Sequence, residues 1–219
     1  MCGIAGIVEC SGRPVSTQSI ESMCHALRHR GPDDEGVVDV GSKSTSDRKA
    51  SAVLGNRRLS VIDVDGGHQP ISNEDGTVWT VLNGEIYNYR ELRKSLEEAG
   101  HYFTTSSDTE VIVHAYEMYA DKFVEYLDGM FAIAIWDSNR RRLVLARDRV
   151  GQKPLVYAVD SDRLLFASEL KALTKVPGRS WDLDLSAADE YLMYQYIPHP
   201  NTIYRDVRKL PPAHFAVYQ

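Results

Sequence analysis

The chain has 219 residues and a formal net charge of −6, with 43% hydrophobic and 26% charged residues. These values are typical of a globular protein with one large domain or two small ones. Charges form no long run of one sign and no apolar stretch reaches membrane length, which argues against a nucleic-acid or membrane partner. The start of the chain has no basic region followed by an apolar one, so we expect no secretory signal. The three cysteines are sparse and odd in number, which favours a reducing, cytoplasmic location.

Hydrophobic periodicity predicts the elements of the first half of the chain. The polar segment 42–49 is expected to be a loop tip, and Ser16 is expected to cap the first helix. Residues 59–64 are apolar and expected to be extended. Strands are predicted at 3–9, 35–40, 51–56 and 77–82, and helices at 17–28, at 88–99 and from Glu110 onward.

Two helix starts carry the spacing of a capping box. Asn88 is followed three residues later by Glu91, and Ser107 stands in the same relation to Glu110. Gly100 is expected to stop the helix that begins after Asn88.

The second half of the chain reads as strand pairs joined by tight turns. Met130 to Trp136 is continuously apolar, which predicts a strand covered on both faces. Strands joined by hairpins, with helices between groups of strands, favour an α+β fold of antiparallel sheets covered by helices. Further strands are predicted at 142–147, 154–159 and 163–168, with helices at 169–174 and 186–194.

The most unusual position is Cys2, directly after the initiator methionine. If Met1 is removed, Cys2 carries both a thiol nucleophile and an α-amino group that can act as its base. Gly3 and Gly6 leave the neighbouring backbone free of Cβ atoms, so a substrate can approach closely. The alternative is a structural cysteine buried in the first strand.

A metal site has little support in the sequence. His25 and His29 are four residues apart and could share an ion with Cys24, but no further pair has zinc-site spacing. Cys24 lies on the apolar stripe of its helix and is expected to pack in the core. We therefore predict no metal ligands.

Several ordered stretches resemble the glutaminase domain of class II glutamine amidotransferases, which are N-terminal nucleophile hydrolases. Within that group the similarity is greatest to the glutamine-hydrolysing asparagine synthetases. It covers essentially the whole chain and implies two antiparallel sheets face to face with helices outside, a four-layer αββα sandwich. The stretches that carry it are 1–6, 28–33, 58–63, 83–88, 107–110, 148–155, 194–198 and 207–212.

This resemblance implies that the catalytic residues are Cys2, Asn83 and Gly84. Cys2 would attack the side-chain carboxamide of glutamine and form a thioester, which water then hydrolyses to glutamate. The Asn83 side-chain amide and the Gly84 backbone N–H would form the oxyanion hole. The alternative for the Asn-Gly pair is a hairpin turn, although the helix predicted just after it makes a hairpin less suitable.

The resemblance also implies the residues that bind the amino-acid end of glutamine. Arg58 would hold the α-carboxylate, because a planar guanidinium matches a carboxylate. Asp108 and Glu85 would hold the α-ammonium, and the backbone at Val61 and Ile62 would complete the site. Asp108 could also serve as a helix cap.

Arg57 and the segments 28–33 and 130–136 are given no direct part in the chemistry. Arg57 is expected to be a solvated surface residue. Residues 28–33 lie where the resemblance implies a lid over bound glutamine. The strand at 130–136 could line an ammonia tunnel, but plain core packing is the simpler expectation.

The resemblance further implies a partner. Residues 2–175 are predicted to be the glutaminase domain and 176–219 an extension leading toward a synthetase domain. The pyrophosphate-binding Ser-Gly-Gly-x-Asp-Ser loop and the Gly-x-x-x-x-Gly-Lys motif do not occur here. We therefore expect no cofactor in this chain, and ATP and Mg²⁺ only in that synthetase domain. Glutamine is the expected substrate, ammonia the product passed on, and a homodimer is possible. The alternatives are the glutaminase half of another amidotransferase of this kind, or a non-catalytic regulatory module.

Overall fold

The computed structural model describes residues 1–41 and 50–219, and the predicted loop tip at 42–49 lies outside the described residues. Its strands form two sheets in which all neighbouring strands are antiparallel. The strands of the first sheet are β1 (Gly3–Glu9), β2 (Asp34–Asp39), β3 (Ser51–Arg58), β8 (Val156–Val159), β9 (Arg163–Ala167) and β10 (Val207–Lys209). Those of the second are β4 (Ile71–Ser72), β5 (Val78–Ile86), β6 (Gly129–Asp137), β7 (Arg142–Arg147) and β11 (Phe215–Tyr218).

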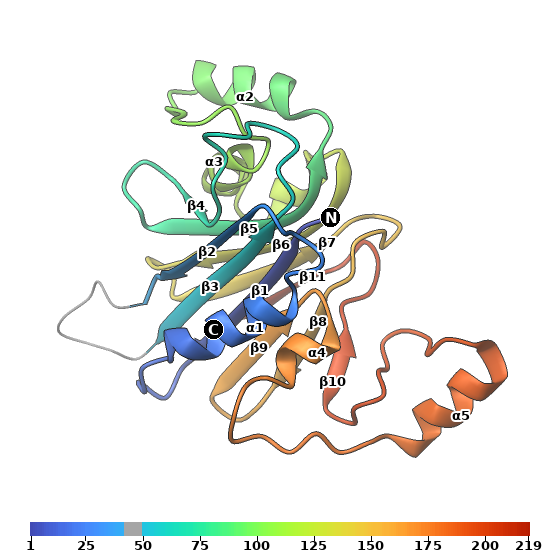
Figure 1. The fold of residues 1–219 in the computed structure, drawn as a ribbon. Helices are drawn as coiled ribbons and strands as arrows, with labels where there is room; N and C mark the ends of the chain where they lie inside the picture. The colour runs from blue at the N-terminus through green and yellow to red at the C-terminus, as the bar shows by residue number, and fades with distance from the viewer. Residues whose placement is uncertain (42–49) are drawn as a thin grey trace.

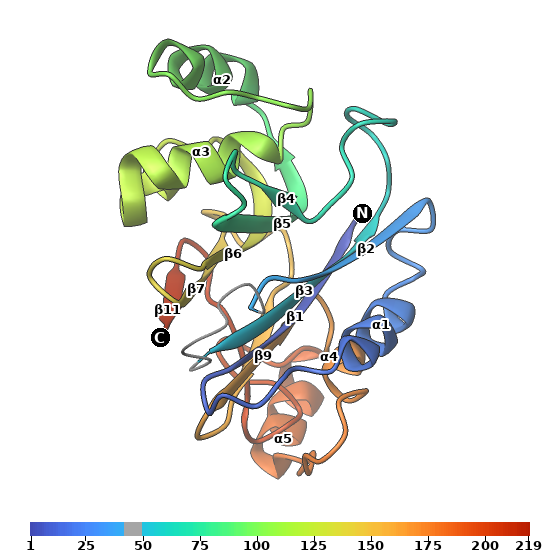
Figure 2. The same ribbon diagram turned by 90° about the vertical axis from the view of Figure 1, so that its left-hand side faces the viewer.

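The two sheets pack face to face, and helices cover their outer faces (Figure 1). The strand order is β10-β8-β9-β1-β3-β2 in the first sheet and β11-β7-β6-β5-β4 in the second. The helices are α1 (Thr17–Ala26), α2 (Tyr89–Glu98), α3 (Glu110–Tyr119), α4 (Leu170–Leu173) and α5 (Leu185–Tyr194), with a 3₁₀ helix at Ala120–Glu125. Figure 2 shows α2 and α3 over the second sheet and α1 and α4 over the first. The predicted four-layer α+β sandwich is confirmed.

The apolar run of β6 explains why the layers hold together. Alternate residues of a strand point to opposite faces. Phe131, Ile133 and Ile135 pack toward α3 in one apolar cluster. Ala132 and Trp136 pack in another cluster, against side chains of the first sheet. The prediction that this strand is covered on both faces is therefore confirmed.

The predicted helix caps are wrong in detail, although the helices themselves are in place. Neither Asn88 nor Ser16 makes a side-chain cap hydrogen bond. The Glu110 carboxylate accepts hydrogen bonds from Thr104 and Thr105 instead of reaching back to Ser107. The α3 helix therefore starts from a loop folded around the Glu110 carboxylate.

Two further expectations have opposite outcomes. Gly100 follows α2 with φ +101°, a left-handed conformation that suits glycine, so the predicted stop is confirmed. The extended segment predicted at 59–64 is wrong, because these residues form a loop outside both sheets. That loop carries an aspartate with positive φ, Asp63.

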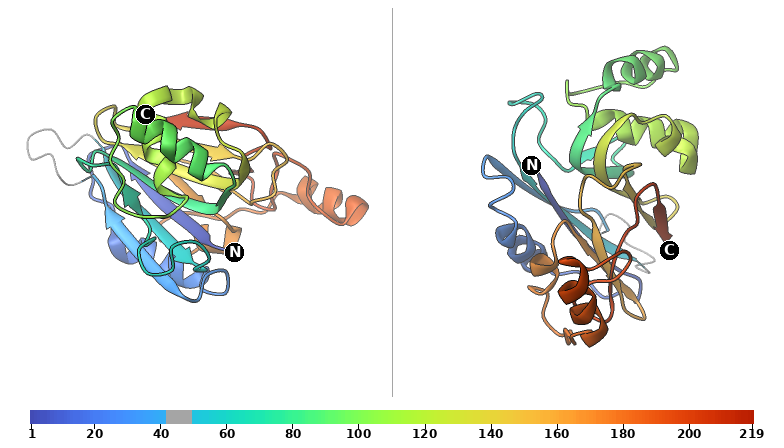
Figure 3. Two further views of the ribbon diagram at one scale, coloured as in Figure 1. Left: turned by 90° about the horizontal axis from the view of Figure 1, so that it is seen from above. Right: turned by 90° about the vertical axis from the view of Figure 1, so that its right-hand side faces the viewer.

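The last quarter of the chain contributes to both sheets. Strand β10 pairs with β8, and β11 pairs with β7. Helix α5 lies away from the two sheets (Figure 3), and five of its large apolar side chains are exposed. They are Leu185, Tyr191, Leu192, Met193 and Tyr194. The proposed boundary between 2–175 and 176–219 stays a prediction. No helix within residues 1–41 and 50–219 has the length and apolarity needed to cross a bilayer.

The expectation for Arg57 is wrong. Arg57 is buried, its Nε donates to the Gly31 carbonyl at 2.9 Å, and its guanidinium pairs with the Glu35 carboxylate. Neighbouring residues of a strand point to opposite faces, so Arg57 faces the outer side of the first sheet while Arg58 faces inward. Sequence spacing could not show that the 28–33 turn covers that outer side.

Replacing Arg57 with alanine should therefore destabilise the fold. The change leaves the Gly31 carbonyl and the Glu35 carboxylate without their donor. We expect the free energy of unfolding to fall by about 2 to 3 kcal/mol, measured by urea denaturation. Arg90→Ala, at an exposed position of α2, is the matched control and should stay within about 0.5 kcal/mol of the unchanged protein. Equal effects of the two changes would show that Arg57 is a surface residue after all.

Candidate active site

One pocket gathers all the predicted site residues at the end of the sandwich where β1 begins and β3 ends. Because β1 and β3 are antiparallel, with Gly3 opposite Arg57, Cys2 and Arg58 come to the same edge. The second half of β5 and the residues just before α3 complete the walls, and the cavity has a volume of about 150 Å³. The lining residues are Met1, Cys2, Arg58, Leu59, Val61, Ile62, Gln69, Asn83, Gly84, Glu85, Ser107, Asp108, Thr109, Met130 and Lys153.

The Cys2 thiol lies just before the central strand β1. Its Sγ donates to the Leu59 carbonyl at 3.8 Å, and its main-chain carbonyl accepts a hydrogen bond from Arg30 Nε at 2.9 Å. Burial raises the pKa of the thiol, while the positive charges of the chain's amino terminus and Arg58 act in the opposite direction. A thiol with a raised pKa is mostly protonated near neutral pH, so its use as a nucleophile needs a nearby base.

Asn83 is a fully buried polar residue without partners. Within the part of the chain that the structure describes, neither its Nδ2 nor its Oδ1 has a hydrogen bond, although buried amides are nearly always paired. Asn83 lies inside β5, paired with Ala132 of β6, so the alternative of a hairpin turn is wrong. By strand alternation its side chain shares a face with Val81, which packs between the two sheets.

The backbone of β5 leaves a donor free beside Asn83. Leu82 N–H donates to the Gln69 side chain at 2.7 Å, and Ile86 N–H donates to Asp108 Oδ2 at 2.9 Å. Both N–H groups therefore point away from β6, and Gly84, midway between them, points its N–H the same way. A Cβ atom at Gly84 would lie 2.0 Å from the Met130 carbonyl oxygen, so only glycine fits.

Arg58 shapes the loop that forms the opposite wall. Its guanidinium donates to the carbonyls of Ile62, Asp63 and Val64 at 2.8, 2.6 and 3.1 Å. It thereby fixes the backbone at Val61 and Ile62 against the pocket. Arg58 is itself buried and lines the pocket.

Two carboxylates lie close together in the pocket without a cation. Burial and the nearby Glu85 charge raise the pKa of Asp108, against the hydrogen bond from Ile86 N–H. Neither Glu85 nor Asp108 has an ion-pair partner among the residues that the structure describes. Such a pair is suited to a bound ammonium group, whose charge would stabilise both ionised carboxylates.

Sequence reasoning missed several pocket residues. Gln69 joins three elements: its Oε1 accepts from Leu82 N–H and Asn56, and its Nε2 donates to Thr109 at 3.1 Å. Lys153 is buried and reaches the pocket from the loop after β7. Lys153 belongs to the stretch 148–155, which carried the family resemblance, but nothing in its spacing indicated a place in the pocket.

The Arg28–Asp33 turn is fastened next to Cys2 by an ion cluster. Glu169 accepts hydrogen bonds from Arg30 at 2.8 Å and His29 at 3.0 Å, and pairs with Lys171 at 3.2 Å. Burial opposes the charged form of Glu169, but these three partners lower its pKa to about 2. Because Arg30 also holds the Cys2 carbonyl, Glu169 positions the backbone of the proposed nucleophile.

The metal site considered from the sequence, at Cys24, His25 and His29, is not supported by the geometry. Within residues 1–41 and 50–219, Cys24, His25 and His29 do not form a group whose ligand atoms could share one ion. Cys24 is a buried core residue beside α1 neighbours, as predicted.

Comparison with known proteins gives a consistent result. The family model for the glutamine amidotransferase domain matches residues 1–219. Glutamine-hydrolyzing asparagine synthetase 1 of Bacillus subtilis strain 168 is 40% identical over 218 residues, 97% of this chain and 33% of that protein. Synthetase 2 of the same organism is 44% identical over 180 residues, 81% of this chain and 23% of that protein. The chain thus spans about a third or less of these relatives.

Solved structures share the fold. Glutamine phosphoribosylpyrophosphate amidotransferase from B. subtilis, in complex with ADP and GMP, superimposes with a TM-score of 0.62 at 26% identity. The match covers 78% of this chain and 43% of that one. An allosteric regulatory enzyme of purine biosynthesis gives a TM-score of 0.63 at 23% identity, covering 79% and 43% of the two chains.

Glu169→Gln should weaken the fold in a pH-dependent way. The folded-state pKa of Glu169 lies below its ordinary value of 4.5, so its stabilisation is complete above about pH 4.5 and is lost as the pH falls toward 2. Because Glu169 is partly open to solvent, which screens its ion pairs, we expect only about 1 kcal/mol at pH 7. The measurement is the free energy of unfolding of both proteins between pH 3 and 7.

The control for this change is Glu98→Gln, at an exposed position at the end of α2, which should have little effect throughout. A difference between wild type and Glu169→Gln that is the same at pH 3 and pH 7 would contradict the role given to the charge.

Proposed function

The chain belongs to the class II glutamine amidotransferases, and on this premise we propose that it hydrolyses glutamine to glutamate and ammonia through a thioester on Cys2. The observation that carries the proposal is the buried, unpartnered amide of Asn83 in the pocket that Cys2 also lines. An orphaned amide inside a packed strand costs stability, about 1 to 3 kcal/mol for a buried unsatisfied group. It is explained if its partner is an oxygen that is present only during the reaction.

The first chemical step uses Cys2 as both nucleophile and base. After removal of Met1, the α-amino group takes the thiol proton, and Sγ attacks the carboxamide carbon of glutamine. The carbonyl oxygen becomes an oxyanion, which accepts hydrogen bonds from Asn83 Nδ2 and the Gly84 N–H. The intermediate then collapses: the C–N bond breaks, the leaving nitrogen receives the proton, and ammonia and a thioester remain.

The second step releases glutamate. A water molecule gives a proton to the same α-amino group and attacks the thioester carbon, and the same two donors hold the second oxyanion. The C–S bond breaks and the thiol recovers its proton. Each step needs the base beside the sulfur, which agrees with the raised pKa of the buried thiol.

The far end of the pocket suits the amino-acid group of glutamine. Asp108 and Glu85 form no ion pair with the described residues 1–41 and 50–219, and the α-ammonium would supply a cation to both. Arg58 lines the same cavity and would offer its remaining N–H groups to the α-carboxylate. The backbone at Val61 and Ile62, held by Arg58, would complete the contacts with the substrate.

We further propose that the full protein is an asparagine synthetase, in which ammonia passes to a second domain that uses ATP and Mg²⁺. The support is the identity of 40% and 44% to two such enzymes, whose chains extend well beyond the matched part. The exposed apolar side chains of α5 offer a surface for that domain. A free thiol nucleophile requires a reducing compartment, so we propose the cytoplasm as its location. A homodimer stays a prediction.

The proposal is tested first by the intact mass of the purified chain and its reaction with 6-diazo-5-oxo-norleucine, an electrophilic glutamine analogue. We expect a mass without Met1 and one adduct that maps to Cys2. Cys10→Ala should label normally, because Cys10 lies outside the pocket, whereas Cys2→Ala should neither label nor release ammonia. If a chain lacking Met1 forms no adduct, the domain is a non-catalytic module.

Asn83→Ala should slow turnover rather than weaken binding. Removing one oxyanion donor lowers kcat by about 10²- to 10³-fold, while the groups that hold the amino-acid end stay in place, so KM should change little. Steady-state glutaminase kinetics give both constants. Asn139→Ala, in an exposed turn, is the control and should match wild type. A rise in KM with unchanged kcat would instead make Asn83 a substrate-binding residue.

A further inference from the structure

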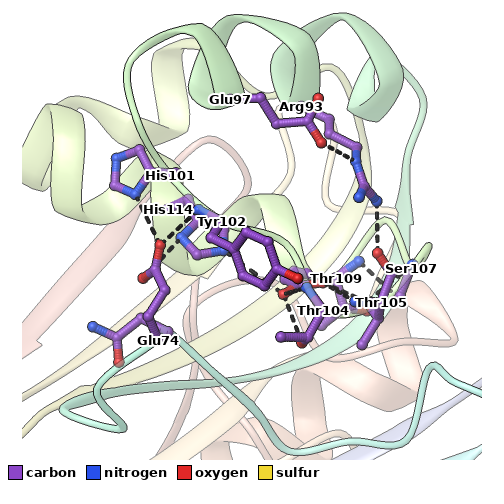
Figure 4. A network of polar contacts seen from close by, with 12 residues as sticks. Glu74, Arg93, Glu97, His101, Tyr102, Thr104, Thr105, Ser107, Thr109 and His114 are labelled. Atoms are coloured by element: carbon purple, nitrogen blue, oxygen red, sulfur yellow. Dashed lines mark hydrogen bonds and ion pairs between the residues drawn. The ribbon is translucent and has the colours of Figure 1, made fainter.

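A second cluster of reactive side chains lies outside the pocket, against α3. Glu74 comes from the turn between β4 and β5, His101 from the connection between α2 and α3, and His114 and Glu117 from α3 itself. One ligand atom from each of the four lies within 4.8 Å of all the others. Figure 4 shows the Glu74 carboxylate pointing at the rings of His101 and His114. Three separate segments therefore converge on one point.

His114 is the member of the cluster that most needs an explanation. It is fully buried, and neither of its ring nitrogens has a hydrogen-bond partner among residues 1–41 and 50–219. Its Nδ1 lies 3.6 Å from a carboxylate oxygen of both Glu74 and Glu117. These separations are too long for hydrogen bonds, yet a buried imidazole is normally satisfied.

The separations are somewhat longer than those between the ligands of one metal ion. A tetrahedral ion with bonds of about 2.0 to 2.1 Å places its ligand atoms about 3.3 to 3.4 Å apart. The nitrogen–oxygen distances are 3.6 Å from His114, and 3.7 and 3.8 Å from His101 Nδ1 to Glu74 and Glu117. All four ligand atoms lie within 4.8 Å of one another, so the side chains would move closer together to bind one ion.

We propose that Glu74, His101, His114 and Glu117 form a binding site for a divalent transition metal, with Zn²⁺ as the preferred ion. Two imidazoles and two carboxylates are a nitrogen and oxygen ligand set typical of zinc. The two carboxylate charges balance the charge of the ion, so neutral imidazoles can complete the shell.

The groups around the cluster hold its ligands in the required orientation. The second ring nitrogen of His114 lies 3.8 Å from the buried Glu110 carboxylate, on the side where the hydrogen-bond acceptor of a metal-bound histidine would lie. Asn73 donates to the second oxygen of Glu117 at 2.7 Å, and Tyr102 N–H donates to Glu74 at 2.9 Å. These hydrogen bonds restrict the rotation of the two ligand carboxylates.

The site is structural rather than catalytic. Four protein ligands fill a tetrahedral shell and leave no position for a substrate. The ion would fasten the β4–β5 turn and the α2–α3 connection to α3. None of the four ligands lines the pocket of Cys2, so the metal should raise stability without being required for glutamine hydrolysis.

The test uses the whole chain after treatment with a chelator, with zinc chloride as the probe. We expect one zinc ion per chain by elemental analysis after dialysis. At a hundredfold excess over Kd, the Tm should rise by about 5 to 10 °C. Magnesium chloride should give no shift, because the imidazole ligands do not suit it. Cobalt(II) should give the visible absorption of a tetrahedral site without a thiolate charge-transfer band.

Variants separate this site from others. His101→Gln and Glu117→Gln together should abolish the stoichiometric zinc and the Tm shift, and circular dichroism would verify that the double variant is folded. His68→Gln, which removes an exposed histidine paired with Asp34, should bind zinc as wild type does. The proposal is overturned if wild type retains no zinc, which would leave an ion-pair network alone. Zinc that persists in the double variant would also overturn it, because the ion would then lie on other ligands such as the Cys2 thiol.

Discussion

The pairing of β1 with β3 is the constraint on which the site depends. Gly3 lies opposite Arg57, so the residue before the strand, Cys2, meets the end of β3 at Arg58. Strand β1 is flanked by β3 and β9, and every one of its residues is buried. A slip of one residue would turn its apolar side chains to the wrong face. The position of a nucleophile at the very start of the chain is thereby set by the core of the sheet.

The pocket accumulates groups that folding alone would disfavour. Among the described residues, the buried Asn83 amide has no hydrogen-bond partner and the neighbouring Asp108 and Glu85 have no ion-pair partner. Burial also disfavours the charged thiolate of Cys2. In the proposed reaction an oxyanion would satisfy the Asn83 amide, an ammonium group would satisfy the two carboxylates, and the α-amino group would take the proton of the Cys2 thiol. Because the pocket is preorganised, the unfavourable free energy of desolvating these groups arises when the chain folds rather than during the reaction. The apolar packing of β5 and β6 on both faces of the second sheet holds these groups in place.

The elements of the fold could be predicted from the sequence because the patterns that indicate them lie within short segments. The apolar run of β6, the helix spacing of α1 and the stop at Gly100 each depend on neighbouring residues. The eight predicted site residues came from ordered family-like motifs, and all of them line one pocket. Their chemical roles stay proposals.

The errors arose where distant segments decide the environment. Arg57 is buried because the 28–33 turn lies over its side of the sheet, and Glu110 caps a loop because Thr104 and Thr105 fold back onto it. The cluster around His114 joins positions 74, 101 and 114, whose spacing resembles no metal motif. Gln69 links Asn56, Leu82 and Thr109 for the same reason: tertiary folding, not sequence spacing, makes them neighbours.

The two walls of the pocket are held by different forces, and this divides the work of the site. Asn83, Gly84 and Cys2 lie in or beside central strands, where apolar packing on both faces resists local opening. The facing wall is loop backbone, held by polar contacts of Arg58 with three carbonyls and of Asp63 with the Ser106 N–H at 2.8 Å. Segments held in this way open at a lower free energy than core strands. The groups assigned to bond cleavage therefore stand on the rigid wall. The loop wall, which includes the backbone at Val61 and Ile62 proposed to contact glutamine, can adjust without moving the groups proposed to react.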